Sequence, residues 1–554
     1  MKNMNIFKSL TVAAAVGASV SLTGCLEETI PSSSITESQL NSSPATGNAL
    51  VWSMPAWLNN FNTTGGSYHY DWGYGSIMHI RDVMTGDMAI VSSNYDHYTA
   101  WEQNRSISEI YATTGFVWSY LNKQIQPAND AIRFYKSHTE NTDYLGYLGM
   151  AYAFRAFGYL DLARMYEFLP NDKVSGVNDN GNDVTGLTVP YVTESTTQEM
   201  AVNNPRLPHY SRPDFLNGAN ISDSILRDLN EAERLLEGVK RADKTLPDLS
   251  VVYGLKARYY MWNEDYPKAQ EYARLAINAS TCSPTTEAEW TSATSGFNNI
   301  SANSWMWGSQ LVAENRLVTT GIINWTSWSS NETSYGYAAA GPMLLIGTDE
   351  MYSQISDYDF RKLSWVAPEG SPLQGKETFV SPVFSPYEEG ENALKPYCSL
   401  KFRPNLGDYS NYLTGSASGY PLMRIEEMYF IEAEAAAHTN PAQGKQLLSD
   451  FMRKYRYGMY RTNATSLEDI VEEIIFQKRV ELWGEGQSYF DIKRLNMSVT
   501  RATNDSNFEG YSRMNTTGRP AWMNFVIVRS EGQTNLAVRD WNNPPSDGVY
   551  SPML

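Results

Sequence analysis

The spacing of apolar positions predicts a largely helical protein. Residues 116–138 and 143–168 repeat apolar side chains every three to four positions, and we expect them to form a long antiparallel helix pair. Asp143 is a plausible start signal for the second helix, and Pro170 a plausible stop. Residues 221–237 carry an apolar stripe on one helical face, which predicts a third helix.

Two further segments have the pattern of paired helices. Residues 250–280 resemble a tetratricopeptide repeat, and residues 420–456 form a second similar unit. Small residues at the predicted crossings would let two helices approach closely. A last long helical pattern runs from 467 to 495. In the repeat-like unit 250–280, the small and aromatic positions that carry the pattern are Ala257, Tyr260, Tyr266, Ala269 and Ala276.

Helical periodicity fades between residues 283 and 418. Turn residues and aromatic rings increase there, and the stretches 304–312 and 391–404 could each contain a strand. An Asn/Asp/Gly-rich segment at 171–215 is a smaller irregular excursion.

These patterns predict a mainly α-helical fold in a single domain, residues 49–554. The scaffold would consist of tetratricopeptide-like helix pairs over about 116–280 and 419–497. The segment 283–418 would be a loop-rich, ligand-binding insert with a few short strands. Insertions in helical-repeat scaffolds often gather on the binding face.

The first 25 residues have the pattern of an export signal. Lys2 and Lys8 precede a short apolar run that is too short to span a membrane, which predicts a signal peptide over 1–24. Leu22-Thr23-Gly24-Cys25 looks like a bacterial lipobox, so we expect cleavage before Cys25 and lipidation of its thiol. Residues 25–48 are polar and without periodicity, and they predict a flexible tether.

Charge and cysteine content exclude several classes of function. The formal net charge is −18, and it becomes −20 without the two lysines of the leader, which disfavours nucleic acid and anionic lipid as ligands. Cys282 and Cys398 could pair with each other, but they cannot form a disulfide framework or a zinc site. The six histidines show no metal-ligand spacing, so we predict no metal or cofactor; Asp357 and Asp359 are the one place to look for Ca²⁺.

Residues 469–495 carry the most specific motif. The sequence "DIVEEIIFQKRVELWGEGQSYFDIKRL" resembles the signature of the SusD/RagB family, with Gln477-Lys478 in place of the usual Glu-Arg. The segments at 151–170, 188–194 and 419–437 agree with the same family in the same order. The matching positions of the signature are Glu481, Leu482, Glu485, Gly486, Phe490, Asp491, Lys493 and Arg494.

The resemblance implies a non-catalytic glycan-binding lipoprotein on the outer-membrane surface. Such proteins act as a lid on a TonB-dependent transporter of the SusC type and pass oligosaccharides to it. The family fold is mostly helical, with tetratricopeptide-like units and a ligand face made of loops. One branch of the family, typified by RagB, binds peptides instead.

Three acidic residues of the signature could be mistaken for catalytic carboxylates. Glu481 and Glu485 are four residues apart and share one helical face. The segment around them is rich in large apolar residues and in arginine and lysine partners, whereas a glycosidase pair must flank an open cleft. We therefore interpret Glu481, Glu485 and Asp491 as structural.

The loop 323–337 places tryptophan and tyrosine among small polar residues, where no helix or strand pattern accounts for them. Aromatic rings cover the C–H faces of sugars, and neighbouring amides and hydroxyls bond the sugar hydroxyls. Similar clusters occur at 68–74 and 93–104. The ligand-binding residues that we predict are Trp72, Trp101, Trp325, Trp328 and Tyr335 for the rings, and Asp71, Asn94, Asn324 and Arg361 for the polar contacts.

The sequence alone leaves three functions open. A neutral oligosaccharide or polysaccharide ligand is favoured by the aromatic loops. A RagB-like peptide-binding protein is the alternative, and a secreted glycosidase is a third. The sequence does not identify the glycan.

Overall fold

The computed structural model describes residues 44–66, 68–91, 97–213, 218–341, 344–390 and 392–553. Contacts divide the chain after Asn48 into two units, and the second, Ala49–Leu554, holds the scaffold and the loops. The predicted signal peptide, Cys25 and most of the predicted tether lie outside the described residues, as does Asn94. Residues Pro44–Asn48, which we predicted to be part of the tether, are helical.

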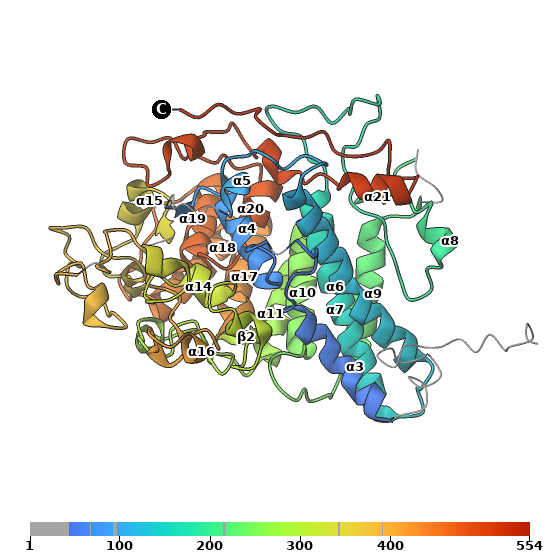
Figure 1. Cartoon of the computed structure of the whole chain (residues 1–554), viewed down its shortest axis with the longest axis horizontal. Helices are drawn as coiled ribbons and strands as arrows, with labels where there is room; N and C mark the ends of the chain where they lie inside the picture. Colours follow the sequence, from blue (N-terminus) through green and yellow to red (C-terminus); the bar gives the residue numbers. More distant parts are fainter. Residues whose placement is uncertain are drawn as a thin grey trace, which may run out of the picture. The chain divides into compact units, whose positions relative to one another are not determined.

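The described part of the chain is mainly helical, as predicted (Figure 1). None of its helices is both long enough and apolar enough to cross a membrane. The longer helices are α3 (Pro44–Trp57), α4 (Tyr74–Val83), α6 (Ala112–Lys136), α7 (Thr142–Tyr166), α9 (Ile221–Leu236), α10 (Leu249–Trp262), α11 (Tyr266–Ala279), α17 (Ile425–Thr439), α18 (Pro441–Tyr455) and α19 (Leu467–Glu481).

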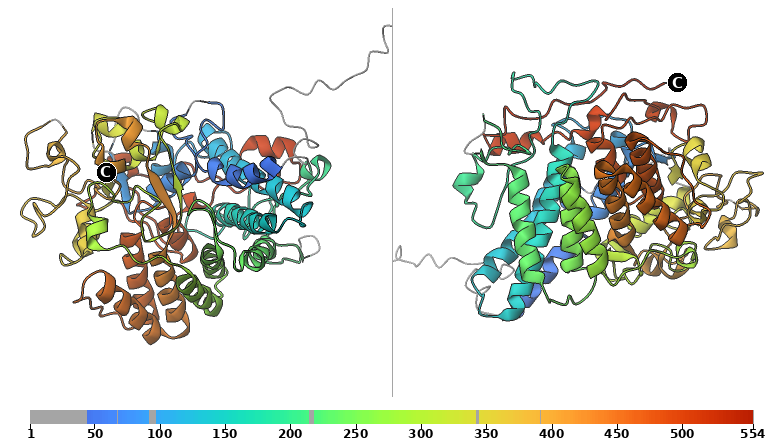
Figure 2. Two further views of the ribbon diagram at one scale, coloured as in Figure 1. Left: turned by 90° about the horizontal axis from the view of Figure 1, so that it is seen from below. Right: turned by 180° about the vertical axis from the view of Figure 1, so that it is seen from behind.

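The scaffold helices pack as a series. α6 packs on α7, α7 on α9, α9 on α10 and α10 on α11, so the first part follows the order of the chain. The series continues with α17, which packs on α11 although the insert separates the two in sequence (Figure 2). Both α18 and α19 then pack on α17. The insert is therefore looped out between two neighbouring helices, while the tetratricopeptide-like geometry of the pairs stays a prediction.

Buried ion pairs connect helices of this series, both neighbours such as α7 and α9 and the more separated α10 and α17. Arg155 of α7 donates to both carboxylate oxygens of Asp228 on α9, each at 2.7 Å. Arg258 of α10 makes the same two-pronged contact with Glu427 of α17, at 2.7 and 2.6 Å. Such bidentate pairs fix both distance and orientation. The small residues that let α11 approach its neighbours are fully buried: Ala269, Ala273 and Ala276.

Helix α7 begins at Thr142, one residue earlier than predicted, whereas α9 begins at the predicted Ile221. The cap of α7 is Asn141, whose side chain accepts from the amide of Asp143 at 3.0 Å. The cap of α9 is Asn220, which accepts from the amide of Asp223 at 2.7 Å. Asparagine is as good a cap as serine or aspartate, so Asn141 can start α7 ahead of Asp143.

The last helical pattern, predicted from 467 to 495, is broken into α19 and α20 (Ser488–Arg494). Gly484 and Gly486 between them have φ of +76° and +69°. A Cβ atom on Gly486 would lie 2.9 Å from the Cα of Met78, so both backbone conformation and space require glycine there. The amide of Gly486 donates to Asp82 at 2.9 Å, which ties this turn to α4.

The irregular parts of the chain contain many short elements. Within the insert they are α12 (Glu287–Trp290), α13 (Arg316–Thr319), α14 (Trp325–Ser329), α15 (Asp349–Gln354), α16 (Tyr412–Gly415) and 3-10 turns at Tyr337–Ala340, Phe360–Ser364, Pro382–Phe384 and Asn405–Gly407. Elsewhere they are α5 (Thr99–Glu102), α8 (Gln198–Ala201), α21 (Arg529–Thr534) and 3-10 turns at Gly510–Ser512 and Ala521–Met523.

Two short antiparallel strand pairs hold the insert in place. β2 (Trp305–Gln310) pairs with β4 (Gly419–Arg424), so a strand near the start of the insert lies beside the strand that follows its end. β1 (Met88–Ile90) pairs with β3 (Leu344–Ile346) and connects the middle of the insert to the N-terminal part of the domain.

Only one of the two predicted strands is present as a strand. β2 confirms the prediction for 304–312, whereas 391–404 contributes only single bridges, at Cys398 and Ser399. The partner of β2 was missed, because we assigned 419–424 to the helical scaffold. Every residue of β4 is buried, so the segment lacks the alternation that marks a half-exposed strand.

A buried network of charges joins the insert to the C-terminal helices. Glu481, fully buried, pairs with Arg361, Arg424 and Arg456 at 3.0, 3.1 and 2.7 Å. Glu485 pairs with Arg424 at 2.9 Å. Burial alone would raise the pKa of Glu481, but the three arginines lower it well below its usual range. Both Glu481 and Glu485 are thus held in buried ion pairs, as their interpretation as structural residues predicts.

Candidate functional site

The four predicted stacking tryptophans lie inside the protein. Trp72, Trp101 and Trp328 are each 1% exposed, and Trp325 is 2% exposed. Trp328 stacks on Tyr337 with ring centroids 3.7 Å apart, and Trp325 meets Trp72 edge to face at 6.2 Å. Because protein covers these rings, they fill the core beneath the loops, and their placement does not support direct stacking on a ligand.

A one-turn helix places the two tryptophans of the loop. We expected irregular backbone around Trp325 and Trp328, whereas both lie on α14. Asn324 caps this helix, accepting from the amide of Ser327 at 3.0 Å, and its side-chain amide faces the carbonyl of Leu317 at 3.4 Å. Asn324 is fully buried, so its polar atoms serve the backbone rather than a sugar hydroxyl.

The predicted polar contacts of Asp71 and Arg361 are also internal. Asp71 accepts from the hydroxyl of Thr63 at 2.9 Å and from the amide and hydroxyl of Thr64 at 2.8 Å each, which shapes the turn before it. Arg361 is fully buried and belongs to the charged network around Glu481. A buried charge must be paired, and both side chains are paired by the protein itself.

Tyr335 alone, among the predicted site residues that the structure describes, is partly exposed. Its ring meets that of Tyr412 edge to face at 6.5 Å, and Tyr412 is itself exposed.

Beside the buried rings lies an accessible edge, which we call the aromatic rim: Tyr68, His69 and His97. Tyr68 is 37% exposed and stacks on buried Tyr70 at 5.1 Å with an interplanar angle of 5°. His69 stacks on His97 at 4.6 Å and bonds to the hydroxyl of Tyr337. Burial lowers the pKa of His69, which keeps its ring neutral near pH 7. The rim therefore joins an exposed tyrosine ring to two stacked imidazoles, backed by the core.

The sequence contained a signal for the rim that we did not use. Tyr68 and His69 directly precede Asp71 and Trp72, and Gly65-Gly66 comes just before them. A glycine pair is typical of an exposed turn. The ring next to that turn is the one on the surface.

Four buried indole donors have no hydrogen-bond partner among the described residues, and two of them, Nε1 of Trp325 and Nε1 of Trp328, lie in the aromatic core; the others belong to Trp57 and Trp365. By contrast, Nε1 of Trp72 donates to the hydroxyl of Tyr98 at 2.8 Å. A buried donor without a partner is unfavourable by roughly 1–3 kcal/mol. The aromatic core is thus not optimised as a purely structural unit at these two positions.

The SusD family model matches residues 261–534 of the chain. The chain belongs to the SusD family. This match spans the insert, the charged network and the C-terminal signature, whereas the aromatic rim lies N-terminal to it. The resemblance inferred from the signature is thereby confirmed.

Solved structures share the SusD-like fold over nearly the whole chain. A SusD-like carbohydrate binding protein from Bacteroides vulgatus is 22% identical with a TM-score of 0.69, covering 91% of this chain and 99% of its own. A SusD superfamily protein from Bacteroides thetaiotaomicron is 15% identical with a TM-score of 0.64, covering 90% and 99%. Surface glycan-binding protein A from Bacteroides uniformis is 16% identical with a TM-score of 0.60, covering 89% and 98%. A comparison with curated protein sequences finds no match.

The possible calcium position of this SusD-family chain is occupied by ion pairs. Asp357 pairs with Lys362 at 2.8 Å, and Asp359 pairs with Arg361 at 2.7 Å. Within the described residues, no group of three or more histidine, cysteine, aspartate or glutamate side chains is arranged to hold a metal ion. Cys282 and Cys398 are both free thiols.

Proposed function

We propose that this SusD-family protein binds a neutral glycan without catalysing a reaction. It is held on the outer-membrane surface by lipid on Cys25 and passes the glycan to a SusC-like TonB-dependent transporter. Family membership is the observation that carries the proposal. Two solved relatives are described as a SusD-like carbohydrate binding protein and a surface glycan-binding protein, which supports the same ligand class.

We place glycan contact at the aromatic rim. A sugar ring would stack on Tyr68, whose other face is covered by Tyr70. A ring held from behind loses little conformational freedom when a ligand binds, so its stacking contributes more to affinity. In this proposal Trp101 and Trp328 support the rim from the core instead of touching the glycan.

The test is a glycan array followed by calorimetry on protein starting after Cys25. We expect one class of neutral glycan to bind. Tyr68→Ala should weaken it by roughly 1–2 kcal/mol, about 5- to 30-fold in Kd. Tyr511→Ala is the matched control, because Tyr511 is 70% exposed and distant in sequence from the rim. Equal affinity of the two variants would show that the rim is not the site.

The same array separates the alternative ligand class. If no glycan binds while peptides do, the RagB-like interpretation replaces the glycan. Release of reducing sugar by the purified protein would instead favour a secreted glycosidase. The transporter step is tested separately, by copurification with a SusC-like barrel. In cells, we expect copurification only when the leader and Cys25 are intact. In detergent, we expect the purified protein to bind an added barrel without them.

A further inference from the structure

A crevice lies on the helical scaffold, and none of its lining residues belongs to the aromatic rim. It has a volume of about 340 Å³, which is in the range of small-molecule sites. Its walls come from the end of α7, the loop before α9, the turn between α10 and α11, and the C-terminal segment. We call it the Tyr210 crevice, and the lining residues used below are Glu167, His209, Tyr210, Trp262, Arg494 and Arg519.

Three parallel rings form one wall of the Tyr210 crevice. The ring of His209 lies 3.7 Å from that of Trp262, with an interplanar angle of 5°. Tyr210 lies 4.0 Å from His209 on the other side, at 13°. Tyr210 is 52% exposed and is the outer ring of the stack.

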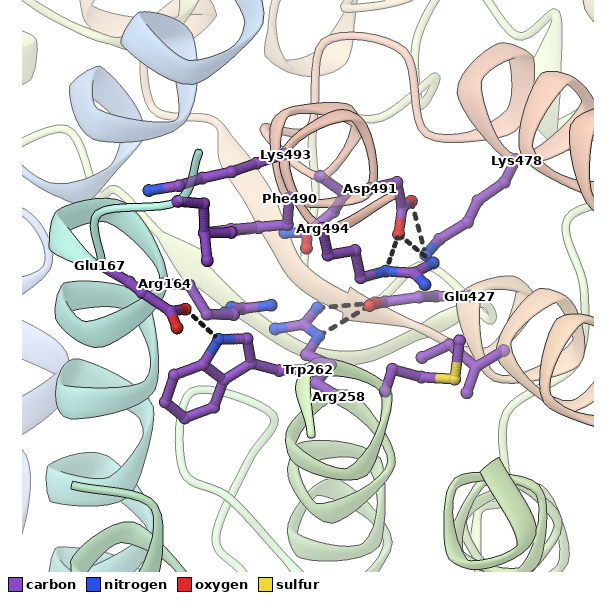
Figure 3. A pocket seen from close by; sticks show the side chains of 14 residues that line it. Arg164, Glu167, Arg258, Trp262, Glu427, Lys478, Phe490, Asp491, Lys493 and Arg494 are labelled. Atoms are coloured by element: carbon purple, nitrogen blue, oxygen red, sulfur yellow. Dashed lines mark hydrogen bonds and ion pairs between the residues drawn. The ribbon is translucent and has the colours of Figure 1, made fainter. Parts of the chain in front are cut away.

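Hydrogen bonds fix each ring of this stack. Glu167 bonds to Nδ1 of His209 at 2.7 Å and accepts from Nε1 of Trp262 at 2.8 Å; the latter bond is drawn in Figure 3. The hydroxyl of Tyr210 donates to the carbonyl of Asn263 at 2.9 Å. The stack is therefore a rigid platform that offers one aromatic face to solvent.

Behind the platform lies a group of buried basic side chains that make no ion pair within the described part of the chain. Arg206, Lys493 and Arg519 are 1%, 2% and 9% exposed, and none makes an ion pair with a described residue. Their hydrogen-bond partners are backbone carbonyls: Lys493 donates to Met165 at 2.9 Å and Arg519 to Pro170 at 3.2 Å. The Nε atom of Arg519 is buried and has no partner in the described part of the chain.

Two carboxylates, Glu167 and Glu264, line the crevice and act on Arg519, and Glu167 is already engaged. Glu167 is bonded to the histidine and tryptophan of the stack, and Arg494 on the opposite wall is paired with Glu434 and Asp491. Burial lowers the pKa of Lys493 well below its usual range; the carboxylate of Glu167 opposes this shift, and the nearby charges of Arg519 and Arg206 add to it. Buried cations without a counter-charge are unfavourable, and an anion that entered the crevice would relieve this cost.

We propose that the Tyr210 crevice binds one sugar residue that carries an anionic group, either a uronate carboxylate or a sulfate ester. The sugar ring lies on Tyr210, and the anionic group accepts from Arg519. That the ligand is a sugar rests on the proposed glycan-binding function, whereas the preference for an anion rests on the crevice itself. The ligand would thus be a mostly neutral glycan, which suits the strongly acidic surface of the protein. An acidic sugar unit or branch of that glycan would bind in the Tyr210 crevice.

Calorimetry on the protein starting after Cys25, at low salt, tests this with four probes: an oligogalacturonide, a sulfated oligosaccharide, a neutral oligosaccharide of the same length and sodium sulfate. The crevice variants are Tyr210→Ala and Arg519→Gln. Their controls are Tyr511→Ala and Arg529→Gln, since Arg529 is an exposed arginine paired with Glu109. A lost hydrogen bond to a charged group is worth about tenfold in Kd or more.

We expect at least one anionic oligosaccharide to bind, more tightly than the neutral one. Each crevice variant should weaken it about tenfold, and the controls should leave it unchanged. Arg519→Gln removes a buried cation that makes no ion pair, so we expect its Tm not to fall. Tyr210→Ala changes only an exposed ring, and its affinity tests the proposal if the arginine variant is unstable. Comparing uronate with sulfate identifies the anionic group.

Unchanged affinity in both crevice variants would overturn the proposal. So would sodium sulfate binding as tightly as the oligosaccharides, because that outcome describes a simple anion site. Tyr68→Ala separates this proposal from the first: loss of neutral-glycan binding in Tyr68→Ala with no effect of the crevice variants supports the rim and rejects the crevice. The reverse pattern supports the crevice and rejects the rim.

Discussion

Replacing Trp328 by phenylalanine probes whether the aromatic core carries a real hydrogen-bonding defect. The indole of Trp328 is 1% exposed, and its Nε1 has no partner among the described residues. Trp72 is equally buried, but its Nε1 donates to the hydroxyl of Tyr98. The same substitution at the two positions therefore differs mainly in one hydrogen bond.

The two positions should respond differently by about 2 kcal/mol. Losing part of a buried aromatic ring is unfavourable by roughly 1–2 kcal/mol in either case. At position 328 the change also removes an unpaired buried donor, which stabilises the fold by about 1–3 kcal/mol. The net change in the free energy of unfolding is therefore near zero. At position 72 the change removes a made hydrogen bond, which adds about 1 kcal/mol to the loss. We expect Trp72→Phe to cost about 2–3 kcal/mol.

Urea unfolding followed by circular dichroism measures both variants against the parent chain, with the slope m compared as well as the midpoint. Trp328→Ala serves as a size control and should cost about 3 kcal/mol or more, because a large cavity replaces the ring. If Trp328→Phe is as destabilising as Trp72→Phe, the donor of Trp328 is satisfied in solution, and the reasoning about the core is wrong.

Three further outcomes are expected from the structure. Glu481→Gln should destabilise the fold by about 3–5 kcal/mol at pH 7 in urea unfolding, because it leaves three buried arginines undercompensated; a loss below 1 kcal/mol would contradict this. The folded pKa of Glu481 lies below its unfolded value, so its contribution is complete above about pH 4.5 and declines as the pH falls below that, and Glu481→Gln should flatten the acid side of a stability–pH curve. Gly486→Ala should lower the urea midpoint by an amount equivalent to more than about 1 kcal/mol, whereas Gly458→Ala, with open space around its Cβ position and no positive φ, should be nearly neutral; similar midpoints would refute the requirement for glycine.

The scaffold could be predicted from sequence because its helices have strong local patterns. The apolar stripe of α9 and the long apolar repeats of α6 and α7 are visible in windows of a dozen residues. The break between α19 and α20 could not be placed by periodicity, since it depends on a tertiary contact between Gly486 and Met78. The Gly-Glu-Gly sequence at 484–486 is typical of a turn or a helix C-cap, but the periodicity on both sides predicted one continuous helix.

The placement of the aromatic residues could not be predicted in the same way. A tryptophan among serines and asparagines fits either a ligand platform or the core of an irregular loop, and burial at Trp325 and Trp328 depends on partners as distant in sequence as Trp72 and Tyr98. The same holds for the Tyr210 crevice, whose ring stack combines residues 209, 210 and 262. The helical pattern of 250–280 places Trp262 in a packed helix, but it does not indicate that the ring stacks on His209.

The pairing of β2 with β4 has a consequence for how this architecture can change. Trp305 and Arg424 face each other across the ladder, so more than a hundred intervening residues leave and return at neighbouring points. When the two ends of a segment are already held together, doubling its length costs only about 0.6 kcal/mol of closure entropy. The segment behind this clasp can therefore lengthen, shorten or be exchanged between relatives while the helices keep their contacts, and new ligand faces can arise on an inherited frame.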